Sequence, residues 1–132
     1  MLETGLKGTK TLVVSPELTA ARYGSGALEV FATPAMIALM EGTCQELVQP
    51  HLEAGRGTVG TGVCARHLGA TPVGMQVRCE AVLTEIDRRR LTFEVKVYDE
   101  KELVGEGRHE RFIIDNEKFF AKVQGKIGAV QQ

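Results

Sequence analysis

Hydrophobic positions divide the chain into one helical segment and several strand-like segments. Between residues 34 and 48, apolar side chains recur every three or four positions, the spacing of one face of an α-helix. Thr33 is a suitable N-cap for this helix, and Pro34 suits its first position, where the missing N–H is not needed. Pro50 and the glycine pair at 55–57 end the pattern. We therefore predict one long helix over residues 34–48.

After this helix, apolar and polar positions alternate, which is the pattern of strands that are buried on one face only. Four segments show this alternation, at 58–68, 75–86, 91–98 and 103–114. A first strand is expected at 10–14 and a short closing helix at 116–123. The joins between the later strands are too short for the crossover helices of a parallel sheet. The strands are therefore predicted to be antiparallel.

The open face of such a sheet has to be covered, and the helix at 34–48 is the only predicted element apolar enough to cover it. This arrangement predicts an α+β protein of the hotdog fold, in which a curved antiparallel β-sheet wraps around one long central α-helix. No repeat, linker or low-complexity segment interrupts the sequence. A single domain over residues 1–132 is therefore expected.

Charge and composition argue against several classes of function. Lys and Arg together number 16 against 17 acidic residues, so no overall positive field is available to hold nucleic acid. The longest nearly uncharged apolar stretch, at 30–40, is too short to span a bilayer, and the first residues lack the apolar core of a signal peptide. The three cysteines have no CxxC spacing and are interpreted as free thiols, packed as small hydrophobic residues. We expect a cytoplasmic protein that binds neither nucleic acid nor membranes.

Two titratable residues fall on apolar faces of the predicted elements. Glu41 shares the mainly apolar face of the helix with Cys44, and His67 shares a strand face with Val59 and Val63. Either residue could be structural, as a carboxylate bonded to a loop or as a histidine satisfied in the core. Because the helix covers this face of the sheet, the two side chains could instead pair. A carboxylate–imidazole pair would move protons near neutral pH.

Thr33 also allows two interpretations. It could be a structural cap, or its hydroxyl could stand beside a reacting carbonyl, because a helix N-terminus offers free N–H groups to a developing oxyanion. The GRGTVG segment at 55–60 matches GxGxxG, but it follows a helix and opens a strand, the reverse of the dinucleotide-binding order. The histidines lack metal-ligand spacing. Neither a metal nor an organic cofactor is therefore expected.

Taken together, these segments resemble one known family. The motifs FAT, LME and VGTG, followed by GEGRHERFIID and EKFFAKV, are similar to the fluoroacetyl-CoA thioesterase-like family of hotdog proteins over roughly residues 30–123. In that family a Thr, a Glu and a His form the catalytic set. The matching residues are Thr33, Glu41 and His67, and the resemblance adds Gly60 and Arg111 as substrate-binding positions that line the site.

The resemblance implies hydrolysis of a small acyl-CoA thioester in a cleft of a homodimer, with coenzyme A as part of the substrate. Glu41 would activate water or attack the thioester, His67 would move protons, and Thr33 would bind the substrate or act as a nucleophile. Members specialised for fluoroacetyl-CoA carry a longer, aromatic-rich lid before FAT, whereas Tyr23 is the only aromatic residue of the stretch at 21–30. Two alternatives stay open: a hotdog dehydratase or isomerase, and a non-catalytic acyl-CoA-binding module.

Overall fold

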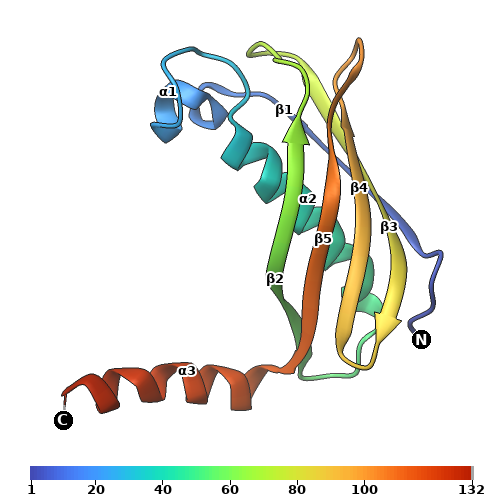
Figure 1. The fold of residues 1–132 in the computed structure, drawn as a ribbon, viewed down its shortest axis with the longest axis vertical. Coiled ribbons are helices and arrows are strands. Elements are labelled where there is room, and N and C mark those ends of the chain that lie inside the picture. Colours follow the sequence, from blue (N-terminus) through green and yellow to red (C-terminus); the bar gives the residue numbers. More distant parts are fainter. Residues whose placement is uncertain (132) are drawn as a thin grey trace.

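Five strands form one antiparallel sheet around a central helix in the computed structural model, which describes residues 1–131 (Figure 1). The elements in chain order are β1 (Lys7–Val13), η1 (Pro16–Leu18), α1 (Ala20–Tyr23), α2 (Thr33–Val48), η2 (Gln49–His51), β2 (Arg56–His67), β3 (Gln76–Asp87), β4 (Arg90–Tyr98), β5 (Leu103–Asp115) and α3 (Asn116–Gln131). The strand order is β1-β3-β4-β5-β2, so β1 and β2 are the two edges. The predicted curved antiparallel sheet around one long helix is confirmed.

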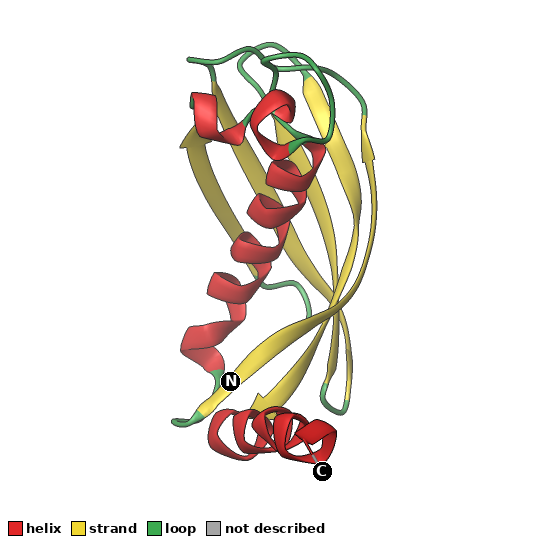
Figure 2. Ribbon diagram, turned by 90° about the vertical axis from the view of Figure 1, so that its left-hand side faces the viewer, coloured by secondary structure: helices red, strands yellow, loops and turns green. Residues whose placement is uncertain are grey.

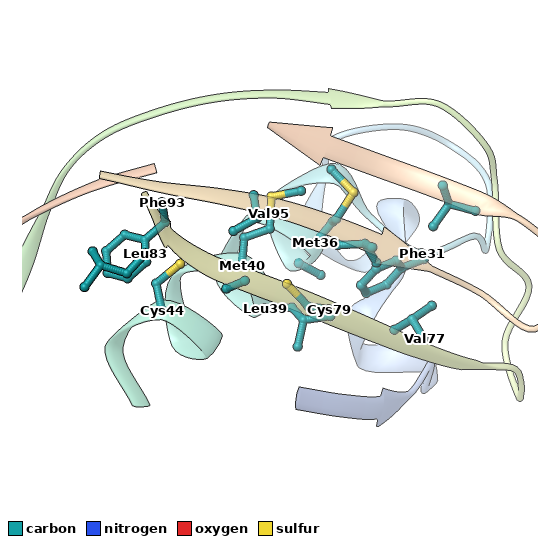
Figure 3. Packing of buried hydrophobic residues seen from close by; sticks show 14 of the residues in the cluster. Phe31, Met36, Leu39, Met40, Cys44, Val77, Cys79, Leu83, Phe93 and Val95 are labelled. Carbon is teal, nitrogen blue, oxygen red and sulfur yellow. The ribbon is translucent and has the colours of Figure 1, made fainter. Parts of the chain in front are cut away.

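Helix α2 packs into the concave face of the sheet (Figure 2). The buried face of α2 repeats every four residues, and it contacts apolar side chains of β3 and β4 (Figure 3). Its fully buried members are Met36, Met40, Cys44 and Val48. Burying one such side chain contributes about 1.5–3 kcal/mol. This face fixes the rotation of α2 and therefore the direction of its remaining, partly exposed side chains.

The N-terminus of α2 differs from the prediction. Ala32 is the N-cap, with φ −74° and ψ 142°, and no side chain caps the helix. Thr33 is already helical, and its hydroxyl is hydrogen-bonded to His67 instead of to a backbone N–H group of α2. The prediction of Thr33 as the N-cap was therefore wrong. Its hydroxyl is hydrogen-bonded to His67 on β2 and is not available to cap the helix.

Strand β2 contains a β-bulge that the sequence pattern concealed. Gly60 and Gly62 pair with successive residues of β5, so one extra residue stands between them. The bulge shifts the alternation of side chains by one position. Val59 therefore lies on the opposite face of the sheet from Val63 and His67, and the prediction that these three residues share a face was wrong.

The remaining differences concern element ends and one cysteine. Strand β1 begins at Lys7 instead of residue 10, and α3 continues to Gln131, well beyond the predicted end at 123. Cys44 and Cys79 are buried, which raises the pKa of both thiols, whereas Cys64 on the edge strand β2 is exposed, against the prediction. Within residues 1–131, no helix has both the length and the apolar character needed to cross a membrane.

Candidate active site

The first part of the site joins the N-terminus of α2 to the end of β2. Thr33 Oγ1 and His67 Nδ1 are 2.8 Å apart. The imidazole ring also lies edge-on to Phe31, with the ring centroids 6.2 Å apart. Burial lowers the pKa of His67, and its Nε2 is buried without a hydrogen-bond partner among residues 1–131. A neutral imidazole that can take the proton of the threonine hydroxyl is therefore favoured at neutral pH.

A hollow of about 310 Å³ opens beside this pair. It is lined by Ala20, Ser25, Val30, Phe31, Thr33, His67, Leu68, Gly69 and Ala70. The first N–H groups of an α-helix have no partner inside the helix, and the helix dipole places partial positive charge there. The hollow thus combines a hydroxyl and a neutral imidazole beside the N-terminus of α2, which suits a carbonyl group that gains negative charge during a reaction.

The second part of the site lies further along α2. Glu41 Oε2 is 3.7 Å from Arg111 Nη1, with the Glu41 side chain 45% exposed and the Arg111 side chain 8% exposed. The guanidinium also donates to Thr58, from Nε to Oγ1 at 2.8 Å and from Nη2 to the carbonyl oxygen at 3.0 Å. Two hydrogen bonds to Thr58 on β2 therefore fix the Arg111 guanidinium in a position where it faces the Glu41 carboxylate on α2.

His109 completes this second group of residues. It is 2% exposed, and its Nδ1 is 2.8 Å from the carbonyl oxygen of Gly62 in the bulge of β2. A carbonyl oxygen only accepts hydrogen bonds, so Nδ1 carries the proton and Nε2 accepts from Arg111 Nη1 at 3.1 Å. Desolvation, together with the charge of Arg111, lowers the pKa of His109. The imidazole is therefore neutral and links the bulge to the guanidinium.

Gly60 lies where these side chains converge. A Cβ atom on Gly60 would stand 2.6 Å from Glu41 Oε2, and 3.3 Å from both Arg111 Nη1 and His109 Cε1. Contacts below 3.0 Å force a neighbour to move, so the carboxylate keeps this place only because the residue has no side chain. The predicted site residues Gly60 and Arg111 therefore lie together with Glu41.

Glu41 and His67, which the sequence left as a possible pair, do not pair within one chain. Glu41 forms an ion pair with Arg111, and His67 is hydrogen-bonded to Thr33. Glu41 follows Thr33 by eight residues on α2, which is about 12 Å along a helix axis at ~1.5 Å per residue. The two groups therefore lie at different heights along α2, and Glu41, with its side chain 45% exposed, lies beside the fully buried face instead of on it.

Sequence reasoning missed two residues of the second group, His109 and Thr58. Both contact Arg111, the first through its ring nitrogen and the second through its hydroxyl and carbonyl oxygens. A signal was present in the HERF motif, because His109 and Arg111 are two positions apart on a strand and therefore point to the same face. Thr58 gave no such signal, since its contact depends on the pairing of β2 with β5.

The fold and the site define the class: a hotdog protein in which a threonine at the start of the central helix and a histidine at the end of β2 pair beside a small hollow. The family model described as fluoroacetyl-CoA-specific thioesterase matches residues 14–117. The fluoroacetyl-CoA thioesterase of Streptantibioticus cattleyicolor is 45% identical over 101 residues, which cover 76% of this chain and 73% of that protein. The chain therefore belongs to the fluoroacetyl-CoA-specific thioesterase family, and the predicted class of acyl-CoA thioester hydrolase is confirmed.

Solved structures agree with this assignment. A structure of the fluoroacetyl-CoA thioesterase has a TM-score of 0.89 and 39% identity, covering 96% of this chain and 98% of that chain. A variant of that enzyme in complex with fluoroacetate and CoA has a TM-score of 0.85 and 39% identity, covering 89% of this chain and 99% of that chain. A thioesterase superfamily member of Thermus thermophilus has a TM-score of 0.87 and 30% identity, with 98% of both chains covered. The hotdog fold is therefore confirmed.

Proposed function

We propose that this protein hydrolyses a small acyl-CoA thioester at a site that two copies of the chain complete. The observation that carries the proposal is the 2.8 Å contact between Thr33 Oγ1 and His67 Nδ1 beside the hollow at the N-terminus of α2. The relative in complex with fluoroacetate and CoA supports an acyl-CoA as the substrate. A volume of about 310 Å³ is at the lower end for ligand pockets and suits a short acyl group.

In this proposal the thioester carbonyl lies against the first turn of α2, where helix N–H groups stabilise the oxyanion. His67 is neutral because burial lowers its pKa, so it accepts a proton from the Thr33 hydroxyl or from water and returns it to the departing thiolate. Glu41 acts on water or on the carbonyl carbon directly. Water is the only co-reactant that hydrolysis needs, so neither a metal nor an organic cofactor is required, and coenzyme A enters as part of the substrate.

The homodimer is part of the proposal because one chain holds the two groups about 12 Å apart. The edge of β2 is open, and Gly60 and His67 both lie on that strand. An antiparallel pairing of two β2 strands centred between Val63 and Cys64 sets Gly60 of one copy opposite His67 of the partner subunit. Glu41, which lies over Gly60, then reaches the hollow of the partner. We expect this homodimer in the cytoplasm.

Selectivity for a fluorinated acyl group is not expected. The stretch at 21–30 carries Tyr23 as its only aromatic side chain, and Tyr23 is 44% exposed. Leu28 in the same segment is 69% exposed. We therefore expect no packed aromatic lid over the hollow with which the site could distinguish fluoroacetyl from acetyl groups. A general preference for short acyl chains follows.

The first test is a free-thiol release assay over acetyl-, fluoroacetyl-, propionyl-, butyryl- and 3-hydroxybutyryl-CoA. We expect turnover of the short saturated thioesters, with kcat/KM for fluoroacetyl-CoA within about tenfold of that for acetyl-CoA. Dehydration of the hydroxyacyl thioester without thiol release would instead indicate a dehydratase. Binding of every thioester without turnover would indicate a binding module.

The second test asks whether two chains build one site. Glu41→Gln and His67→Ala chains are each expected to be inactive as pure dimers. Mixed after mild unfolding and refolding, half of the dimers combine one chain of each kind, and in these one of the two sites has every group intact. Activity should then return to about a quarter of the wild-type value. If the mixture stays as inactive as its components, the site does not combine Glu41 and His67 from different chains.

A further inference from the structure

Helix α3 leaves the body of the protein beside the open edge strand β2. In Figure 1 it runs outward past β2, at the end of the sheet where β2 begins. Its start is fixed there, because the Asn116 N–H donates to the Gly55 carbonyl oxygen at 3.0 Å, and the Asn116 side chain fills the space beside Gly57. The 16 residues of α3 span about 24 Å, which is about the width of five strands.

One face of α3 is apolar and exposed. We call this face the α3 stripe; it consists of Phe119, Phe120, Val123 and Ile127. Phe119, Val123 and Ile127 lie four positions apart, and Phe120 lies three positions before Val123, so the four form one strip along the helix. A second line beside it carries Lys118, Lys122 and Lys126. An isolated helix of this length is marginal in water, and most helices in proteins depend on packing of their apolar face. The α3 stripe is exposed in the single chain, so we expect a second surface to pack against it.

The opposite end of the molecule carries a complementary surface. We call it the distal loops; it consists of residues 24–32, 68–75 and 99–102, which gather where β2 ends (Figure 1). The three segments contact one another through a bridge between Val30 and Pro72 and a 2.9 Å hydrogen bond from Thr71 to Asp99. Their exposed apolar side chains include Leu28 and Leu68, and their exposed acidic ones are Glu29, Glu100 and Glu102, against one exposed base, Lys101.

We propose that α3 of each copy packs its stripe across the distal loops of the second copy. This inference rests on the proposed homodimer through β2. Because paired antiparallel strands run in opposite directions, a two-fold axis at the β2 edge brings the start of one β2, where α3 leaves, beside the end of the other, where the distal loops lie. The α3 stripe then meets Leu28 and Leu68, and the lysine line meets the acidic side chains.

This docking has a consequence for the site. The hollow beside Thr33 and His67 is lined by Ser25, Val30, Leu68, Gly69 and Ala70, all of which belong to the distal loops. Helix α3 of one copy therefore lies at the mouth of the hollow of the other copy. A helix from the second chain would thus cover the entrance that the short segment before α2 leaves open.

The test compares two double variants of the full-length protein by sedimentation equilibrium and by hydrogen exchange of the α3 amides. Phe120→Glu with Ile127→Glu places two charges on the α3 stripe. Ala121→Glu with Gly128→Glu places the same charges at the same seven-residue spacing on the opposite face, where nothing lies within 4 Å of a Cβ built on Gly128. The stripe variant should raise the dimer dissociation constant about tenfold or more, with faster exchange in α3, and the control should change neither.

Three results would overturn the inference. Equal dissociation constants for the wild type and the stripe variant would show that α3 does not dock, while the β2-mediated dimer would stand. A wild-type protein that sediments as a monomer would remove both the docking and the proposed homodimer. If the wild type instead binds phosphatidylserine vesicles, and the stripe variant loses that binding without any change in dimer strength, the stripe belongs to a membrane surface and not to a second copy.

Discussion

Glu41→Gln separates the chemical role of the carboxylate from its structural one. Glutamine keeps the size of the side chain and one acceptor oxygen, but it removes the charge. If the carboxylate activates water or attacks the thioester, kcat should fall by about 10²-fold or more, which corresponds to about 3 kcal/mol of barrier. KM should change little, because glutamine keeps the shape of the side chain and one acceptor oxygen, so binding of the ground-state thioester is largely preserved.

The structure also sets the expected change in stability. Sequence alone predicts that the loss of a half-buried charge leaves stability unchanged or raises it. However, Glu41 Oε2 is 3.7 Å from the buried Arg111 guanidinium, an attraction of about 4.5 kcal/mol at an effective dielectric constant of ~20 and about 1 kcal/mol in bulk water. Because the Glu41 side chain is 45% exposed, solvent screening favours the lower part of this range, about 1–2 kcal/mol. The melting temperature should therefore fall by about 3–8 °C.

Both quantities are measured on the same preparation, by thiol release at saturating substrate and by thermal unfolding. Glu46→Gln is the matched control, because Glu46 is also on α2, has the same charge and pairs with Lys10 on the surface. It should retain wild-type kcat and a melting temperature within about 2 °C. Near wild-type kcat for Glu41→Gln would refute the catalytic role. A melting temperature that stays the same or rises would refute the structural account of Arg111.

Three further predictions follow from the same contacts. Gly60→Ala should lower kcat about tenfold or more with little change in KM, because the new Cβ would displace the Glu41 carboxylate; steady-state kinetics measure both. Thr33→Ala should reduce kcat without the ~1 kcal/mol loss of a helix cap, since its hydroxyl caps nothing; a large fall in melting temperature would contradict this. Because burial lowers the pKa of His67 and of His109, the unfolded chain takes up protons first as the pH falls. The unfolding free energy should therefore be constant above about pH 7 and decrease below about pH 6.5, which denaturant titrations at pH 7.5 and 5.5 would detect.

The elements that depend on local pattern could be predicted from the sequence, and the pairing between distant segments could not. Helix α2 and strands β3 and β4 appear within one or two residues of their predicted bounds, because each has a clear periodicity and short joins. The pairing of β2 with β5 and of β1 with β3 joins segments far apart in the sequence, and alternation carries no information on such partners. The bulge at Gly60 and Gly62 was concealed for a related reason, since glycines add no side chain to the pattern.

For the candidate site, the sequence could propose residues but not the contacts between them. The family motifs indicated Thr33, Glu41 and His67, and geometry brings Thr33 and His67 together at 2.8 Å. Helical periodicity shows which face a residue is on but gives no partner, so it could not show that Glu41 faces Arg111 within the chain. Within the chain, Glu41 pairs with Arg111, and Arg111 is hydrogen-bonded to His109. The sequence alone does not show that His109 is buried.

The separation of the two groups has a chemical reason. A carboxylate beside His67 would favour the protonated imidazole and raise its pKa, so that less of the neutral base that Thr33 needs would be present. In the single chain the charge of Glu41 faces Arg111 instead, and burial keeps His67 neutral. In the proposed dimer, Glu41 approaches His67 of the partner subunit while it is still bound to its own Arg111, so that the guanidinium offsets part of its charge. The reaction is then coupled to assembly, because a folded single chain holds a neutral base and a carboxylate that cannot reach the same thioester.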